Sequence, residues 1–185
     1  MFDERKAAQV AAYLLQKRGG TMSHLKLMKL LYLCEREAMD RYERPITYDH
    51  FVSMPHGPVL SQTYEYMSGQ TRSDEQQGWE SWIADIQDHR VKLRKKVSRD
   101  DLGLVSDAEI SVLDDVYEKF GRWNRWELRD YTHYQCQEWQ DPHGSSQPIP
   151  YKRVLEALGR DERAANDIDA EIGDQQKIEE LFAEL

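Results

Sequence analysis

The sequence predicts a mainly α fold of the α+β class: a compact helical domain with a small β-sheet or hairpin. Three features lead to this prediction: long segments with apolar residues at helical spacing, short alternating segments, and turn residues between them. The chain has 185 residues, and a domain of that length buries roughly 70% of the surface of its unfolded chain. We expect one domain over residues 1–160 and an acidic tail over 161–185 that forms a marginal helix.

Two helices separated by a pair of glycines open the chain. Residues 2–17 carry apolar side chains at helical spacing, and Gly19-Gly20 supplies the positive φ at which a helix ends. Thr21 or Ser23 can cap a second helix over residues 24–42. The apolar face of that helix is broad, which predicts a central helix packed on more than one side. The positions that form this face are Leu25, Leu27, Met28, Leu30, Leu31, Leu33, Cys34, Ala38 and Tyr42.

The middle of the chain predicts a strand, a rigid turn and a helix. Residues 47–54 alternate and are rich in Tyr, Phe and Val, which favours a short strand near 48–54. The run Pro55-His56-Gly57-Pro58 predicts a fixed turn. A helix over residues 59–67 follows, with proline at its start.

Residues 79–97 fit two structures. A strand over 91–97 with Asp88-His89 as a hairpin turn is one, and a helix over 79–86 is the other. On such a strand Arg90, Lys92, Arg94 and Lys96 share a solvent face opposite Val91, Leu93 and Val97, as in an amphipathic edge strand. That face can also contact phosphate, and the first two helices resemble a helix-turn-helix, although the second is too apolar for a DNA groove. A DNA-binding regulator is therefore the alternative function.

The second half of the chain is helical. Ser106-Asp107-Ala108-Glu109 has the pattern of a capping box, and the helix that it starts is closed by Gly121. Another helix covers about residues 125–139, and its Trp126 and Trp139 are expected in the core. We expect the helices over 24–42 and 107–120 to organise the core together.

A short helix and an acidic segment end the chain. Pro150 begins a helix that extends to Leu158. Residues 161–185 hold nine acidic and two basic residues, a net charge of −7, so the first 160 residues carry only −2 of the total −9. Phosphates and anionic membranes repel an acidic chain, which favours a protein partner with a basic surface. The tail is either a solvated extension or, through its apolar end, part of that contact.

Cysteine usage and hydropathy bear on the compartment. Cys34 and Cys136 form no disulfide framework, which is simplest in a reducing cytoplasm. Residues 1–6 are charged without a following apolar run, unlike a signal peptide. Since no stretch approaches the roughly 18 apolar residues of a spanning helix, we expect a cytoplasmic protein without membrane contact.

The residue patterns of common catalytic sites are missing from the sequence. It contains neither a nucleophile on a glycine elbow nor a glycine-rich phosphate loop, so we expect no enzyme and no cofactor. His133, Cys136 and His143 are of metal-ligating types, but their spacing is not that of a zinc finger and a fourth ligand is not evident. A histidine hydrogen-bonded at a helix end is the simpler interpretation, and a metal-dependent hydrolase is a second alternative.

Three stretches of the chain carry a family resemblance. The first is the helical segment 25–33, Leu-Lys-Leu-Met-Lys-Leu-Leu-Tyr-Leu. The second runs from Phe51 through Gly57-Pro58-Val59 to Tyr64. The third extends from Leu104 to Trp139 and includes Phe120-Gly121, Trp126-Glu127-Leu128 and Thr132-His133. In their order and spacing, over about residues 5–140, they resemble the Panacea domain family, the SocA-like antitoxins also described as phage-associated proteins.

This resemblance implies a bacterial or phage antitoxin that binds its cognate toxin and blocks it, with no catalytic residues of its own. The family pairs one scaffold with many unrelated toxins, so the toxin's identity is not implied. The chain departs from the family pattern at Met54-Pro55-His56, where alanine-tryptophan is usual, and at residues 122–125, where a smaller polar turn is usual. Both departures favour a change in partner choice.

The proline-glycine turn and its neighbours are the candidate partner-binding residues. A turn fixed by two prolines and a glycine displays His56 with little entropy to lose on binding, although the same residues also suit a sharp strand-to-helix turn. Trp123 between two arginines is a candidate hot spot. A steric block of the toxin's active site is the expected mechanism. The candidate residues are Tyr48, His50, Pro55, His56, Gly57, Pro58, Tyr64, Arg122, Trp123 and Arg125.

Overall fold

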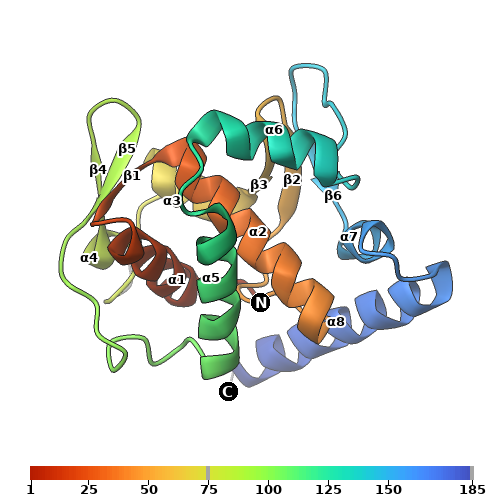
Figure 1. Cartoon of the computed structure of the whole chain (residues 1–185). Coiled ribbons are helices and arrows are strands. Elements are labelled where there is room, and N and C mark those ends of the chain that lie inside the picture. Colours follow the sequence, from red (N-terminus) through yellow and green to blue (C-terminus); the bar gives the residue numbers. More distant parts are fainter. Residues whose placement is uncertain (74–75, 184–185) are drawn as a thin grey trace.

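Helix α2 (His24–Tyr42) is the central element of the computed structural model, which describes residues 1–73 and 76–183. It contacts α1 (Glu4–Lys17), α5 (Asp107–Phe120) and α6 (Arg125–Gln135) on different sides (Figure 1). Most of its side chains are buried, as expected for a helix packed on several sides. The prediction of a mainly helical fold around a central helix is confirmed.

The junction between α1 and α2 contains a strand. Gly19 and Gly20 have φ values of +91° and +89° and end α1 as expected. Strand β1 (Thr21–Ser23) follows, and the Ser23 hydroxyl then caps α2 by accepting a hydrogen bond from the Lys26 amide. The resemblance to a helix-turn-helix is therefore wrong, because β1 intervenes and α2 is buried.

Two antiparallel three-stranded sheets flank the helices. One has the order β1-β5-β4, with β4 (Ile83–Ile86) and β5 (Arg90–Leu93). The other has the order β3-β2-β6, with β2 (Phe51–Met54), β3 (Gly57–Leu60) and β6 (Gln147–Ile149). Strands β1 and β6 were not predicted, because a three-residue strand is too short to show alternation.

The strand expected over residues 47–54 is shorter than predicted. Tyr48 has a φ of +58°, and the carboxylate of the buried Asp49 accepts hydrogen bonds from the Gln62 and Thr63 amides. The Asp49 side chain thus caps the first turn of α3 (Ser61–Ser68) by accepting hydrogen bonds from its free amides. The helix expected over 59–67 begins only at Ser61, because Pro58 lies in the edge strand β3, where a missing N–H is tolerated.

The segment 79–97 combines both expected structures. A short helix, α4 (Trp79–Trp82), precedes β4, and the β4–β5 hairpin turns at Asp88 and His89, whose φ values are +65° and +52°. The predicted turn is confirmed. The prediction of an edge strand is wrong: β5 lies between β1 and β4, and the strand ends at Leu93.

The C-terminal half largely follows the predicted helices. The capping box of Ser106 and Glu109 is confirmed, and α7 (Tyr151–Ala157) follows Pro150. Helix α6 ends at Gln135, four residues earlier than expected, and Trp126 is 45% exposed, which contradicts its assignment to the core. The tail forms one long helix, α8 (Glu162–Ala183).

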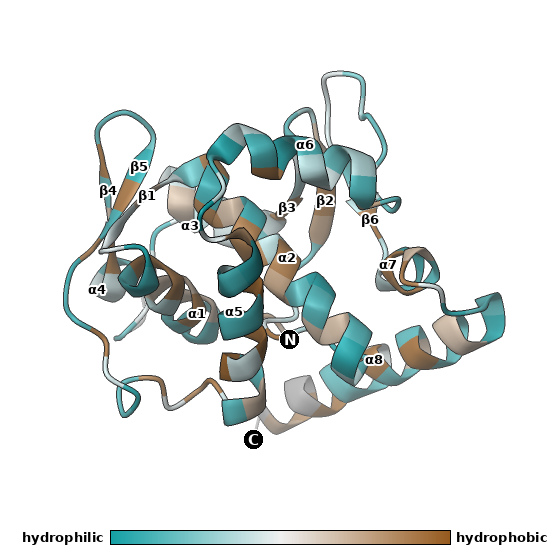
Figure 2. Ribbon diagram, viewed as in Figure 1, coloured by the Kyte–Doolittle hydropathy of each residue, from teal (hydrophilic) through white to brown (hydrophobic). Residues whose placement is uncertain are grey.

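Apolar side chains gather where α1, α2 and α5 face one another, while the tip of the β4–β5 hairpin is hydrophilic (Figure 2). Cys34 and Cys136 are both buried and form no disulfide. Among the described residues, none of the helices has both the length and the apolar character needed to cross a membrane.

Candidate partner-binding face

Lys29 lies buried in α2 beneath the turn between β2 and β3. Its Nζ donates a hydrogen bond to the Pro58 carbonyl oxygen at 2.6 Å. Burial lowers the pKa of Lys29 from 10.5 to about 7, because the ammonium loses its hydration in the interior. This hydrogen bond to the Pro58 carbonyl therefore attaches β3 to α2.

Gly57 allows α2, β3 and α6 to meet closely. Its φ of +96° lies in the left-handed region that favours glycine. A Cβ at this position would lie 2.8 Å from the Thr132 Oγ1 of α6 and 2.9 Å from the Lys29 Nζ. Both the backbone conformation and the close approach thus require glycine before Pro58.

The loop after α6 is fixed to the same turn. The His133 and Trp139 rings stack with centroids 4.1 Å apart and planes within 5°. The Trp139 Nε1 donates a hydrogen bond to the Met54 carbonyl oxygen at 3.0 Å, and the Gln140 amide donates to the Ser53 hydroxyl at 3.2 Å. These contacts tie the end of β2 to α6.

A buried carboxylate attaches this loop to α2 as well. Glu138 accepts hydrogen bonds from the Tyr32 hydroxyl at 2.6 Å and from the Arg36 Nε at 2.7 Å. Its side chain is fully buried, so the ion pair with Arg36 is partly shielded from solvent. Drawing Glu138 inward also gives a physical reason for the early end of α6, since the chain leaves the helix at Cys136.

The turn between α5 and α6 rests on a second buried lysine. The Lys26 Nζ donates hydrogen bonds to the carbonyl oxygens of Gly121 and Trp123, each at 2.7 Å. Burial lowers the pKa of Lys26. Trp123 is half-buried, with its ring edge-on to Phe120 at 5.2 Å and to Tyr131 at 5.6 Å. It mainly packs the turn.

Two aromatic residues of α6, Trp126 and Tyr134, are exposed. The guanidinium carbons of Arg125 and Arg129 lie 4.9 Å and 5.0 Å from the centroid of the Trp126 ring. Cation–π attraction of this kind holds both arginines against the ring. Tyr134, further along α6, is 79% exposed. Aromatic and arginine side chains therefore share the outward side of α6.

A signal for Trp126 was present in the sequence. Asn124 and Glu127 form a second capping box, which fixes the start of α6. Leu128 and Thr132, one turn apart, are the buried residues of this helix, so Trp126 points outward. The expectation that Trp126 is buried rested on residue type alone and is wrong.

Several predicted residues come together with α6. Pro55 and His56 are exposed at the β2–β3 turn, Gly57 and Pro58 are buried beneath them, and the turn rises beside α6 (Figure 1). We call the exposed side chains of this region the α6–turn face. They are Pro55, His56, Arg122, Arg125, Trp126 and Tyr134, and the half-buried Arg129 lies beside them.

Three predicted residues lie elsewhere. Tyr48 and His50 precede β2 and so lie at the end of that strand remote from His56. The Tyr48 hydroxyl donates a hydrogen bond to the Gln175 Oε1 of α8 at 3.2 Å. Tyr64 is half-buried on α3 and packs against the core. The structure therefore divides the predicted set between at least two places.

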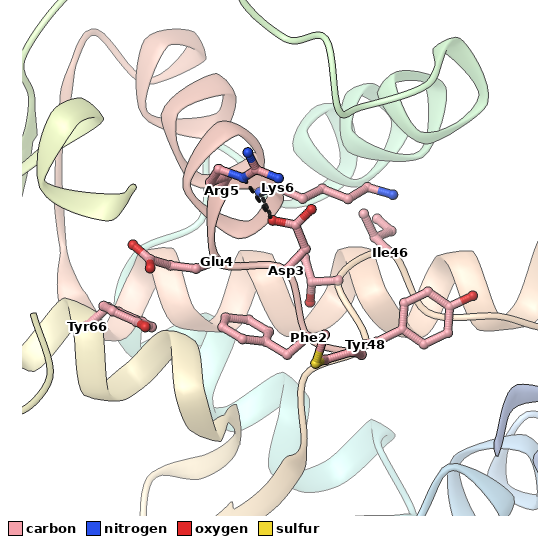
Figure 3. A pocket seen from close by; sticks show the side chains of 10 residues that line it. Phe2, Asp3, Glu4, Arg5, Lys6, Ile46, Tyr48 and Tyr66 are labelled. Carbon is pink, nitrogen blue, oxygen red and sulfur yellow. Dashed lines mark hydrogen bonds and ion pairs between the residues drawn. The ribbon is translucent and has the colours of Figure 1, made fainter. Parts of the chain in front are cut away.

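A pocket of about 470 Å³ lies beside Tyr48, lined by residues 1–6, 46–48 and Tyr66 (Figure 3). The carboxylates that line it are hydrogen-bonded to main-chain amides. Asp3 accepts a hydrogen bond from the Lys6 amide at 3.1 Å, and Glu4 accepts one from the Trp79 amide at 2.6 Å. The lining residues include no serine, cysteine or histidine. They do not supply a nucleophile–base pair of the hydrolase type.

The candidate metal ligands are dispersed. His133 stacks on Trp139, Cys136 is buried with a pKa raised to about 12 by burial, and His143 is exposed. Within residues 1–73 and 76–183, no group of three or more His, Cys, Asp or Glu side chains is placed to hold a metal ion.

The basic segment 90–99 lies on the other sheet. Arg99 forms an ion pair with Asp107 at 2.7 Å, and the Lys95 Nζ lies 4.0 Å from the centroid of the Trp82 ring. Lys92 and Lys96 are exposed and line a groove with Gly19 and Gly20. Several of these cations thus have partners within the chain.

Comparison with known proteins identifies the family. The model of the family described as "Antitoxin SocA-like, Panacea domain" matches residues 27–140, well over half of the chain. The matched range contains α2 from Leu27 onward, the β2–β3 turn and α6. A search of curated proteins finds no match. A search of solved structures finds none either.

Proposed function

Because the chain belongs to the SocA-like Panacea antitoxin family, we propose that it is the antitoxin of a toxin–antitoxin pair. It binds its cognate toxin directly, through the α6–turn face, and blocks it. The family match supports the antitoxin role. The choice of face rests on the physical properties of its side chains.

The observation that carries this choice is the exposed Trp126 between the guanidinium groups of Arg125 and Arg129. Tryptophan and arginine dominate the binding energy of protein interfaces. A tryptophan whose role is only structural is normally buried, as Trp82 is. Trp126 therefore has the exposure and the neighbours of an interface anchor.

The rigidity of the face supports the same proposal. Lys29 is hydrogen-bonded to the main chain beneath the β2–β3 turn, and Lys26 is hydrogen-bonded to the main chain of the α5–α6 turn. Glu138 attaches the loop after α6 to α2. A main chain held in this way loses little conformational entropy on binding. Binding is then close to rigid docking.

The charge of the face suggests the chemistry of the toxin surface. The whole-chain charge favours a basic partner, but the exposed Arg122 and Arg125 make this face locally basic, while Arg129 forms an ion pair with Asp130 at 2.6 Å. We expect the toxin to present an apolar pocket for Trp126 with carboxylates at its rim. The block is steric, so the chain itself makes and breaks no bond. The free, buried cysteines are consistent with a cytoplasmic pair.

Co-expression with the product of the adjacent gene tests the proposal. The neighbour alone should stop growth, and growth should return when both proteins are made and copurify in equal amounts. Trp126→Ala should lose both rescue and copurification. Tyr42→Ala, which alters a 41% exposed side chain at the far end of α2, is the matched control and should keep both.

A harmless neighbour that does not copurify would contradict the proposal. DNA binding through segment 90–99 then becomes the function to test. That alternative predicts binding to the chain's own promoter, with an affinity that falls steeply as salt increases.

A further inference from the structure

Helix α8 has two different faces. Ala165 and Ile172 are buried, and Ile168 is partly buried on the same side. The helix is attached to the domain at its start, where Arg160 forms an ion pair with Asp40 at 2.6 Å and α8 packs on α7. This inner face accounts for only part of the helix surface.

The opposite side of α8 is exposed along most of its described length, and Glu171 at its margin also lines a pocket with Tyr42 and Arg44. Helical spacing places three exposed acidic residues and then three exposed large apolar residues along one line. From the first to the last, this line is roughly 22 Å long at 1.5 Å per residue. We call it the outer face of α8. It consists of Asp167, Glu171, Asp174, Ile178, Leu181 and Phe182.

A groove with complementary chemistry lies at the other end of the molecule. It has a volume of about 570 Å³ and runs between the C-terminal end of α1 and β5. Leu93 and Val97 supply apolar lining, and Lys92 and Lys96 supply exposed positive charge. Gly19 and Gly20 leave one wall without side chains, and a Cβ on either would meet nothing within 4 Å.

We propose that the outer face of α8 docks into this groove of a second copy of the chain. The acidic residues match the lysines and would exchange exposed ion pairs within α8, Asp167 with Arg163 at 3.9 Å and Asp174 with Lys177 at 3.0 Å, for contacts with the second copy. Ile178, Leu181 and Phe182 match the apolar lining. Within one copy the two surfaces lie at opposite ends, with β5 and α8 far apart in Figure 1. They meet only between copies.

The proposed contact is heterologous, because it joins two different surfaces. Such contacts either close into a ring or a reciprocal dimer, or continue from copy to copy. The net charge of −9 opposes close approach of two copies, so association depends on the local match of charge and apolar surface. This proposal does not depend on the antitoxin function.

Sedimentation velocity of the full chain, over a range of concentrations, tests the proposal. The weight-average mass should rise above 21.8 kDa with concentration at low salt. Both Leu181→Asp with Phe182→Asp, in the apolar part, and Asp167→Lys with Glu171→Lys, in the acidic part, should return the mass to that of one copy. These four side chains are exposed, so the fold should survive, and circular dichroism checks this.

A charge exchange gives the sharpest test. Lys92→Glu with Lys96→Glu should abolish association, and combining these changes with Asp167→Lys and Glu171→Lys in one chain should restore it. The control Asp100→Lys with Glu118→Lys reverses two exposed charges outside both surfaces and should leave association unchanged.

Two results would overturn the proposal. One is a wild-type chain that stays monomeric at low salt, and the other is association that the reversals leave unchanged. If the wild type is monomeric but the α8 variants lose copurification of the toxin, the occupant of the outer face is the toxin and not a second copy.

Discussion

The α6–turn face and the outer face of α8 both expose large apolar side chains, but they are supported in opposite ways. The first is basic and rests on buried polar groups of α2, with Lys29 and Lys26 bonded to main-chain carbonyls. The second is acidic and lies on a helix held by a narrow apolar strip and surface ion pairs. Exposure alone does not distinguish a binding face, whereas buried support indicates which surface is held in a fixed geometry.

The largest expected effect is a dependence of the free energy of unfolding on pH, which is caused by the burial of Lys29. The pKa of Lys29 is about 7 in the folded chain and 10.5 in the unfolded one. Between these values the unfolded chain binds more protons, so the free energy of unfolding rises with pH, by at most about 1.4 kcal/mol per pH unit. Urea denaturation from pH 7 to 10 should show this rise in the wild type relative to Lys29→Met. Parallel profiles of the two proteins would contradict it.

Replacement of Gly57 should break the contact between α2, β3 and α6. Gly57→Ala places a Cβ in the left-handed region and against Thr132 and Lys29, which should lower the free energy of unfolding by about 2 kcal/mol or more. Gly173→Ala in α8 is the control, because its Cβ meets nothing within 4 Å. That change should be neutral or stabilise by about 0.5–1 kcal/mol. A Gly57→Ala variant that unfolds at the same urea concentration as the wild type would show that Gly57 is not tightly packed against Thr132 and Lys29.

Two tryptophans three residues apart should separate folding from binding. Trp123→Ala removes part of an aromatic cluster and should lower stability by on the order of 2 kcal/mol. Trp126→Ala should change stability by no more than about 0.5 kcal/mol but weaken toxin binding about 30-fold. Calorimetric titration with the toxin, beside thermal melts, measures both. If Trp123→Ala weakened toxin binding and Trp126→Ala lowered stability, Trp123 and not Trp126 would be the interface anchor.

The smallest effect is expected at the end of α8. Phe182 is 72% exposed, so Phe182→Asp should leave the free energy of unfolding within about 0.5 kcal/mol of the wild type. Rescue from the toxin should also be unchanged, since the proposed toxin site is the α6–turn face. A growth test with the inducible toxin measures this, and loss of rescue in a folded variant would make α8 part of the toxin interface.

Helices with regular apolar spacing and clear caps were predictable from the sequence. Helix α2 and the capped α5 have the predicted bounds. A broad apolar face identifies α2, and a capping box fixes the start of α5. Residues 47–50 were not predictable in the same way. Their conformation depends on contacts made by buried carboxylates, Glu35 with Thr47 and Asp49 with Thr63, and those partners are distant in sequence.

The candidate face was only partly predictable for a related reason. The Pro55–Pro58 turn is visible in the sequence because proline and glycine restrict the backbone. Which tryptophan is exposed depends on the rotation of α6, which Leu128, Thr132 and the capping box fix together. The supports below the face, Lys26 and Lys29, resemble surface lysines in the sequence, and only the packing around α2 reveals that they are buried.

Hydrogen exchange of the complex with the copurified toxin tests the central claim most directly. The toxin should slow exchange in the 55–58 turn and in α6, Arg125–Gln135, and leave exchange in α8, Glu162–Ala183, unchanged. Slowed exchange in α8 with an unchanged α6 and turn would contradict it, and would transfer the toxin site to the acidic end of the molecule.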